Sequence, residues 1–126
     1  RIKLPDRDVI ADQLEGQISQ GELRDALLID GLVRGYPRDH PELAEVLLAV
    51  EVSSVIDRDD VSRARRRAAL LSKSGLVAIP AVAGQQISLG GEDEVRFHKV
   101  VLMQDGRIEH WEAALSRLAP PAGQSE

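Results

Sequence analysis

The sequence predicts an α/β domain with a mixed central β-sheet flanked by helices, and three observations support this class. Residues 46–52 form an apolar run interrupted only by Glu51, which is typical of a strand buried on both faces. Residues 59–74 then place apolar side chains at helical spacing, and a second apolar run follows at 76–82. Strands that alternate with helices in this way favour a sheet covered by helices on both faces.

The composition supports one domain with an aliphatic core. A length of 126 residues suits a single domain, and a hydrophobic share of 43% is too high for a disordered chain. Only one Phe, one Trp and one Tyr are present, so Ala, Val, Ile and Leu must fill the core. We expect the domain to span residues 1–118, followed by a flexible C-terminal tail at 119–126.

The N-terminal part predicts a helix followed by a strand or hairpin. Apolar residues at helical spacing indicate a helix over residues 8–19, with Asp6 as its cap and Gly21 closing it. Residues 23–29 form an apolar run with one charge near its start. Because the hairpin-type dipeptide Asp30-Gly31 follows this run, we interpret it as a hairpin or a bent strand.

The middle of the chain predicts a strand, a helix and a second strand. The run at 46–52 is the expected central strand. The helix at 59–74 is expected to end at Gly75, because glycine commonly follows the last helical residue. The strand at 76–82 contains Pro80, which predicts a position near an edge of the sheet or a strand end.

The C-terminal part predicts a short helix, a last strand and a closing helix. Residues 92–97 are expected to form at least one helical turn, and 99–103 the last strand. Asp105-Gly106 indicates a turn before a helix at 108–118. On that helix, Trp111 is expected to anchor the core or an interface.

Charge and residue types exclude several function classes. A net charge of −5 argues against a general affinity for nucleic acid, because phosphate attracts basic surfaces. The absence of cysteine excludes disulfides, thiol nucleophiles and thiolate metal sites, and the three histidines show no metal-ligand spacing. No apolar run approaches the roughly 20 residues of a membrane span, and no leader pattern is seen, so a cytoplasmic location is the default expectation.

Two acidic residues in apolar runs are the main candidates for chemistry. Asp25 opens one predicted strand, and Glu51 lies inside the central one. An ionised carboxylate there is costly unless it is paired, hydrogen-bonded or bound to a cation. On neighbouring strands, the two acids suit a Mg²⁺ ion, which takes one or two carboxylates and keeps several waters. Alternatively, Glu51 pairs with an arginine of the following helix or points to solvent at the strand end.

The order of these motifs resembles the core of the PD-(D/E)XK nucleases. The similar segments are Arg24-Asp25-Ala26-Leu27-Leu28-Ile29 and Leu48-Ala49-Val50-Glu51-Val52-Ser53, followed by the helix from 59 and the strand at 77–82. The resemblance covers roughly residues 22–105. It implies a restriction-endonuclease-like fold and hydrolysis of phosphodiester bonds in nucleic acid with Mg²⁺ or Mn²⁺.

The resemblance also implies roles for individual residues. Asp25 and Glu51 match the metal-binding acids, with Asp30 as an alternative to Asp25. Val52 matches a position whose backbone carbonyl helps to bind the metal. Ser53 stands where the family has a lysine, and a serine hydroxyl has no positive charge to replace it. We therefore expect an activity that is weak or lost.

A basic group from the following helix is expected to compensate for this lysine. Arg67 is the preferred candidate among Arg66, Arg67 and Lys73; it would stabilise phosphate charge, since arginine stays protonated and cannot act as a base. The wider basic stretch, which comprises Arg63, Arg65, Arg66 and Arg67, is the only candidate surface for contact with the phosphates of nucleic acid. Alternatively, these arginines form a solvated helix face and pair with Asp57, Asp59 and Asp60.

Three functions are compatible with the sequence. The first is a metal-dependent nuclease whose activity is weak or lost, and the second is a catalytically inactive binding or dimerisation module of the same fold. The third is an α/β interaction domain unrelated to the nucleases. A homodimer is one expected partner, because small domains with apolar edge strands often pair with themselves.

Overall fold

A computed structural model describes residues 2–3, 6–43 and 45–118. A six-stranded sheet has the order β1 (Ile2–Lys3), β2 (Gly31–Gly35), β3 (Val46–Val52), β5 (Val77–Ala83), β7 (Val101–Gln104) and β8 (Arg107–Glu109). The three central strands β3, β5 and β7 are parallel, and the remaining pairs are antiparallel. The predicted mixed sheet is therefore confirmed. The tail expected at 119–126 lies outside the described residues.

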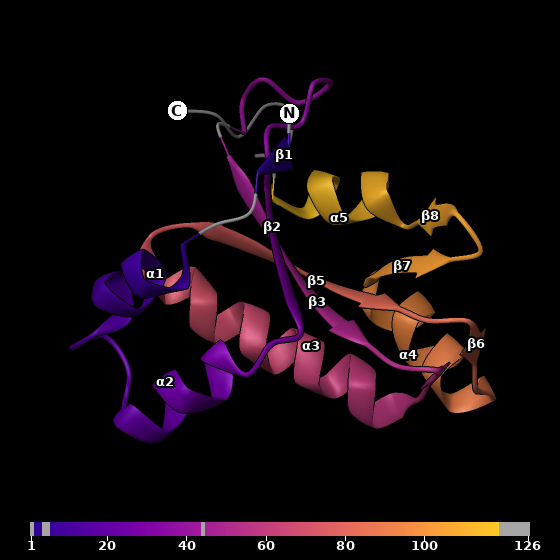
Figure 1. Cartoon of the computed structure of the whole chain (residues 1–126). Helices are drawn as coiled ribbons and strands as arrows, with labels where there is room; N and C mark the ends of the chain where they lie inside the picture. Colours follow the sequence, from indigo (N-terminus) through magenta and orange to yellow (C-terminus); the bar gives the residue numbers. More distant parts are fainter. Residues whose placement is uncertain (1, 4–5, 44, 119–126) are drawn as a thin grey trace.

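The parallel strands are joined by the two longest helices (Figure 1). Helix α3 (Arg58–Leu71), extended by the 3₁₀ turn η1 (Ser72–Ser74), connects β3 to β5, and α4 (Leu89–His98) connects β5 to β7. Short strands β4 (Val55–Ile56) and β6 (Gln86–Ile87) pair in parallel before these helices begin. The predicted helix at 59–74 and central strand at 46–52 are confirmed.

Helices α1 (Arg7–Leu14) and α2 (Gln20–Leu27) differ from the sequence prediction. Asp6 caps α1 as expected, but the helix ends at Leu14, and Gly21 lies inside α2. The strand or hairpin predicted at 23–29 is wrong. Ser19 accepts a hydrogen bond from the Glu22 N–H while Glu22 accepts one from the Ser19 N–H, and this capping box starts a helix there.

The two faces of the sheet are covered unequally. In Figure 1, α1 to α4 lie on one side, and of the described helices only α5 (Trp111–Leu118) lies on the other. Along β3, Leu47 and Ala49 pack in the cluster with α1, α2 and α3, whereas Val46, Leu48 and Val50 pack in the cluster with α5. Because side chains alternate between faces along a strand, Glu51 points to the α3 side.

Two further expectations need correction. Pro80 lies in the middle of β5, which has β3 on one side and β7 on the other, and not at an edge. Proline is tolerated there because β7 pairs only with Ala81–Ala83, just beyond it. The helix predicted at 108–118 begins at Trp111, since residues 107–109 form β8 after the turn at Asp105-Gly106, and β7 is therefore not the last strand.

Candidate acid–arginine site at the end of strand β3

Glu51 and Asp25 come together from different elements. Glu51 is the penultimate residue of β3 and is 4% exposed. Asp25 lies in the last turns of α2, and its side chain is 27% exposed. Both carboxylates contact Arg67 of α3, and Asp25 lies on a helix and not on the neighbouring strand that was expected.

The Arg67 guanidinium lies between the two carboxylates. Its Nη1 donates to Glu51 Oε2 at 2.9 Å, and its Nη2 and Nε donate to Asp25 Oδ1 at 3.2 and 3.3 Å. The Arg67 and Glu51 side chains are 10% and 5% exposed. A buried charge of this kind is tolerated only when it is paired and hydrogen-bonded. The alternative that Glu51 pairs with an arginine of the following helix is thus confirmed.

Two more arginines of α3 complete the arrangement. Arg66 donates from Nε and Nη2 to the two oxygens of Asp25, at 2.8 and 3.1 Å. Arg63 donates from Nε to Glu51 Oε1 at 3.4 Å, and from Nη2 to Asp60 Oδ1. We refer to Asp25, Glu51, Asp60, Arg63, Arg66 and Arg67 as the Arg67 network. Its three carboxylates balance its three guanidinium groups, so it has no net formal charge.

Helix geometry explains why these side chains meet. Arg63 and Arg67 are four residues apart and therefore lie on the same face of α3. Asp60 is fixed at the start of this face by a reciprocal capping box, in which it and Asp57 each accept the other's backbone N–H at 2.9 Å. The hydrogen bond from the Asp60 N–H is the main reason that the pKa of Asp57 is lowered.

The charges in the network stabilise one another. The hydrogen bond from Arg66 is the largest influence on Asp25 and holds the pKa of its carboxyl below 3.8. The same contact raises the pKa of Arg66. A lowered carboxyl pKa contributes stability that is present above the unfolded value and is lost as the pH falls through the folded value. The Asp25 contribution is therefore complete above about pH 4 and is lost in stronger acid.

The other predicted site residues lie at the same strand end. The Val52 N–H donates to Asp30 Oδ2 at 2.8 Å, so the alternative acid Asp30 also reaches this rim. The Val52 side chain is 60% exposed. Ser53, which the resemblance aligned with a lysine, donates from Oγ to the Val55 carbonyl at 2.9 Å, and its N–H donates to the Ala83 carbonyl at 3.0 Å.

The arrangement differs from an open metal centre. Among the described residues, no group of three or more His, Asp or Glu side chains is placed to hold a metal ion. Asp25 and Glu51 have the hard oxygen atoms that suit Mg²⁺, but the Arg67 guanidinium lies between them. Their partner here is therefore an organic cation supplied by the chain itself.

The basic stretch on α3 is largely neutralised, with partners that sequence reasoning only partly anticipated. Asp60 was one of the expected partners, while Asp25 and Glu51 take the remaining contacts of Arg63, Arg66 and Arg67. Within the described part of the chain, no ion pair joins these arginines to Asp57 or Asp59. Arg65 is exposed. The sequence signal for the contact between Asp60 and Arg63 was their three-residue spacing on one helix. The contacts of Asp25 had no such signal, because they depend on where α2 lies in the fold.

Comparisons with known proteins add no family. No family model matches the chain, and neither the curated proteins nor the solved structures contain a match. In the described part of the chain, none of the helices combines the length and apolar character needed to cross a membrane.

Proposed function

We propose that this chain is a catalytically silent, nuclease-like binding module, in which the Arg67 guanidinium replaces the divalent ion between Asp25 and Glu51. The observation on which the proposal depends is the pair of contacts from this one guanidinium to both carboxylates. The order β3, α3, β5, with Glu51 near the end of β3, supports the restriction-endonuclease-like fold. The position of Asp25 on α2 departs from that fold's strand aspartate.

Electrostatics favour a silent site over an active one. A Mg²⁺ ion at Asp25 and Glu51 would have to displace Arg67, which stays protonated at any physiological pH. Displacement leaves a buried guanidinium without its partners, which is strongly unfavourable. Ser53 adds no positive charge to orient an attacking water or to offset charge on a phosphate. Both features reduce the capacity for metal-assisted hydrolysis.

An assay for nuclease activity tests this proposal. Wild-type protein incubated with single- and double-stranded DNA and with RNA, in Mg²⁺ or Mn²⁺, is expected to give no cleavage above the metal-free blank. The variant Glu51→Gln, which keeps the side-chain shape, is the matched control and is expected to behave in the same way. Cleavage of DNA or RNA by the wild type that is absent in Glu51→Gln would contradict the proposal.

A second candidate is a metal-dependent phosphodiesterase. It is favoured by the position of Asp25 and Glu51 on one shared cation, and Asp30 accepts a hydrogen bond from the Val52 N–H next to Glu51. Such an enzyme requires Arg67 to leave the two carboxylates when metal and substrate bind. The two candidates therefore differ in whether the wild type takes up a divalent ion.

If the chain is a catalytically silent binding module, its affinity for nucleic acid is expected to be weak. Arg63, Arg66 and Arg67 already neutralise carboxylates of this chain, so fewer free cations remain on α3 to replace counterions on a phosphate backbone. The overall charge of −5 acts in the same direction. The proposed binding module thus uses another surface for its partner.

A further inference from the structure

A cavity of about 590 Å³ lies on the sheet face opposite the Arg67 network. Its lining includes the side chains of Val33 from β2, Leu48 from β3, Met103 from β7, Ile108 from β8 and Trp111 from α5. Leu48 belongs to the apolar cluster on the α5 side of β3, whereas Glu51 belongs to the other side. The cavity and the acid–arginine site are therefore separated by the sheet.

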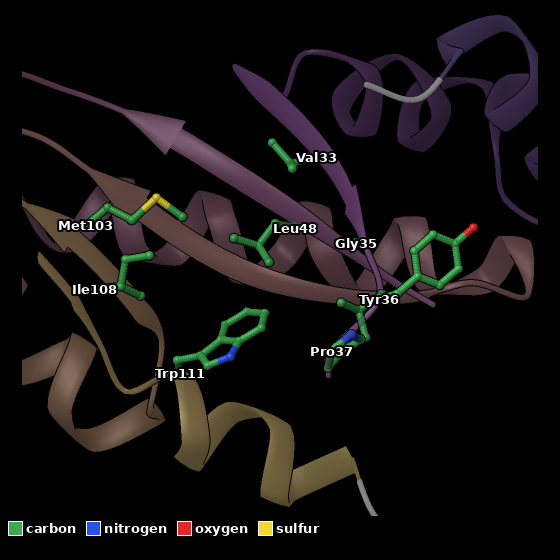
Figure 2. Close-up of a pocket in the computed structure, with 9 residues that line it drawn as sticks. Val33, Gly35, Tyr36, Pro37, Leu48, Met103, Ile108 and Trp111 are labelled. Carbon is green, nitrogen blue, oxygen red and sulfur yellow. The ribbon is translucent and has the colours of Figure 1, made fainter. Parts of the chain in front are cut away.

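Beside the cavity, this face of the sheet is covered by α5 and by the segment that contains Leu43. Ala114 and Leu115 of α5 belong to the same apolar cluster as Leu48. Figure 2 shows Trp111 below Leu48, between Ile108 on one side and Pro37 on the other. The space between these side chains is left open to a ligand.

Two opposite sides of the cavity are linked by a polar contact. His40, in the segment that follows Tyr36 and Pro37, binds Glu112 at 2.8 Å through its Nε2 and Glu42 at 3.2 Å through its Nδ1. Glu112 directly follows Trp111 at the start of α5. The contact joins the Pro37 segment to the Trp111 helix in the absence of a ligand, and sites that are largely formed beforehand bind at lower entropic cost.

The lining determines the chemistry of the ligand. Among the described residues, no Asp, Glu, Lys, Arg or His side chain lines the cavity, so these residues offer a charged molecule no partner for the solvation it would lose there. The indole of Trp111 and the thioether of Met103 favour contact with a flat ring. The volume lies within the range of roughly 300–1,000 Å³ that is usual for small-molecule sites. We propose that this cavity binds a small, uncharged, ring-containing apolar molecule.

The distribution of exposed apolar side chains favours a small molecule over a second copy of the chain. Tyr36 and Ile108 are the large exposed hydrophobic residues at the cavity. The other large exposed hydrophobic side chains of the described residues belong to segments that do not line it; they are Val9, Leu28, Val52, Val55, Leu89 and Phe97. A stable interface needs about 800 Å² on each partner, and this apolar surface is confined to a recess.

Binding of N-phenyl-1-naphthylamine, an uncharged aromatic probe, tests the inference. Trp111 is the only tryptophan of the chain, so energy transfer from its indole reports a probe bound to the protein, and substitutions in the lining locate the site. Saturable 1:1 binding is expected. Val33→Phe places an aromatic ring inside the cavity, where it competes with the ring of the probe, and is expected to weaken binding at least tenfold. Val9→Phe, on α1 across the sheet, makes the same change and leaves the affinity unaltered.

Other outcomes overturn the inference. Absence of saturable binding, or equal affinity in Val33→Phe and the wild type, excludes a ligand site here. Circular dichroism shows whether Val33→Phe is folded. If it is unfolded, a second pair of variants replaces it: Ile108→Glu at the exposed rim of the cavity and Val55→Glu on β4. Only Ile108→Glu is expected to lose affinity for the probe. A dimer in sedimentation equilibrium that dissociates as probe binds identifies this face as an interface between copies instead.

Discussion

Replacing Arg67 with methionine is expected to lower the free energy of unfolding by about 3–5 kcal/mol, because breaking a buried ion pair from one side leaves an uncompensated charge. Glu51 is 5% exposed at its side chain and retains only the 3.4 Å contact with Arg63. Asp25 still has Arg66, so the loss is concentrated at Glu51. Urea denaturation followed by circular dichroism measures the change.

The matched control for this substitution is Arg65→Met on the same helix. Arg65 is exposed, so its replacement is expected to change the stability by no more than about 0.5 kcal/mol. The double variant Glu51→Leu/Arg67→Met removes both buried charges and is expected to recover most of the loss. A loss below about 1 kcal/mol in Arg67→Met would show that the guanidinium is solvated and not held between the carboxylates.

Gly84→Ala is the second substitution with a large expected effect. Gly84 follows β5, and an added Cβ would lie 2.2 Å from the Ser53 carbonyl oxygen and 2.9 Å from Ile56 Cγ1. The backbone oxygen cannot move freely, since the Ser53 N–H is bound to the Ala83 carbonyl at 3.0 Å. Overpacking of this kind costs about 1–3 kcal/mol, and we expect the upper end of this range in thermal or urea unfolding.

Gly21→Ala provides the comparison for the change at Gly84. Gly21 lies in α2, and no heavy atom within 4 Å would meet its added Cβ. Because alanine restricts the unfolded chain, this variant is expected to be about 0.4–1 kcal/mol more stable than the wild type. Equal effects of the two substitutions would contradict the close packing between the ends of β3 and β5.

The core of the fold was predictable because its periodic signals are strong. The continuous run in β3 and the apolar stripe of α3 identified both elements and their order. The segment at 23–29 was misassigned because its apolar run lies at the end of a helix that begins with polar residues. The Ser19 and Glu22 spacing of a capping box was present and would have corrected it.

The site was only partly predictable because its contacts depend on tertiary structure. The free-energy cost of burying a charged carboxylate identified Glu51 as a candidate. The same argument gave an arginine of the following helix as an alternative partner for it. The ion pair between Arg67 and Asp25 could not be predicted from the sequence. It depends on how α2 packs against α3, and no local sequence pattern indicates that packing. The apolar cavity was not foreseen, since its lining comes from β2, β3, β7, β8 and α5, which only the tertiary structure brings together.

Thermal unfolding of the wild type with and without Mn²⁺ tests most directly whether Arg67 has replaced a metal ion. A ligand that binds only the folded state at a hundred times its dissociation constant adds about 2.7 kcal/mol of stability. We expect no Mn²⁺-dependent rise in the Tm of the wild type, and a rise in Arg67→Met, where both carboxylates lack their shared partner. A saturable rise in the wild type that Glu51→Gln abolishes would contradict the account.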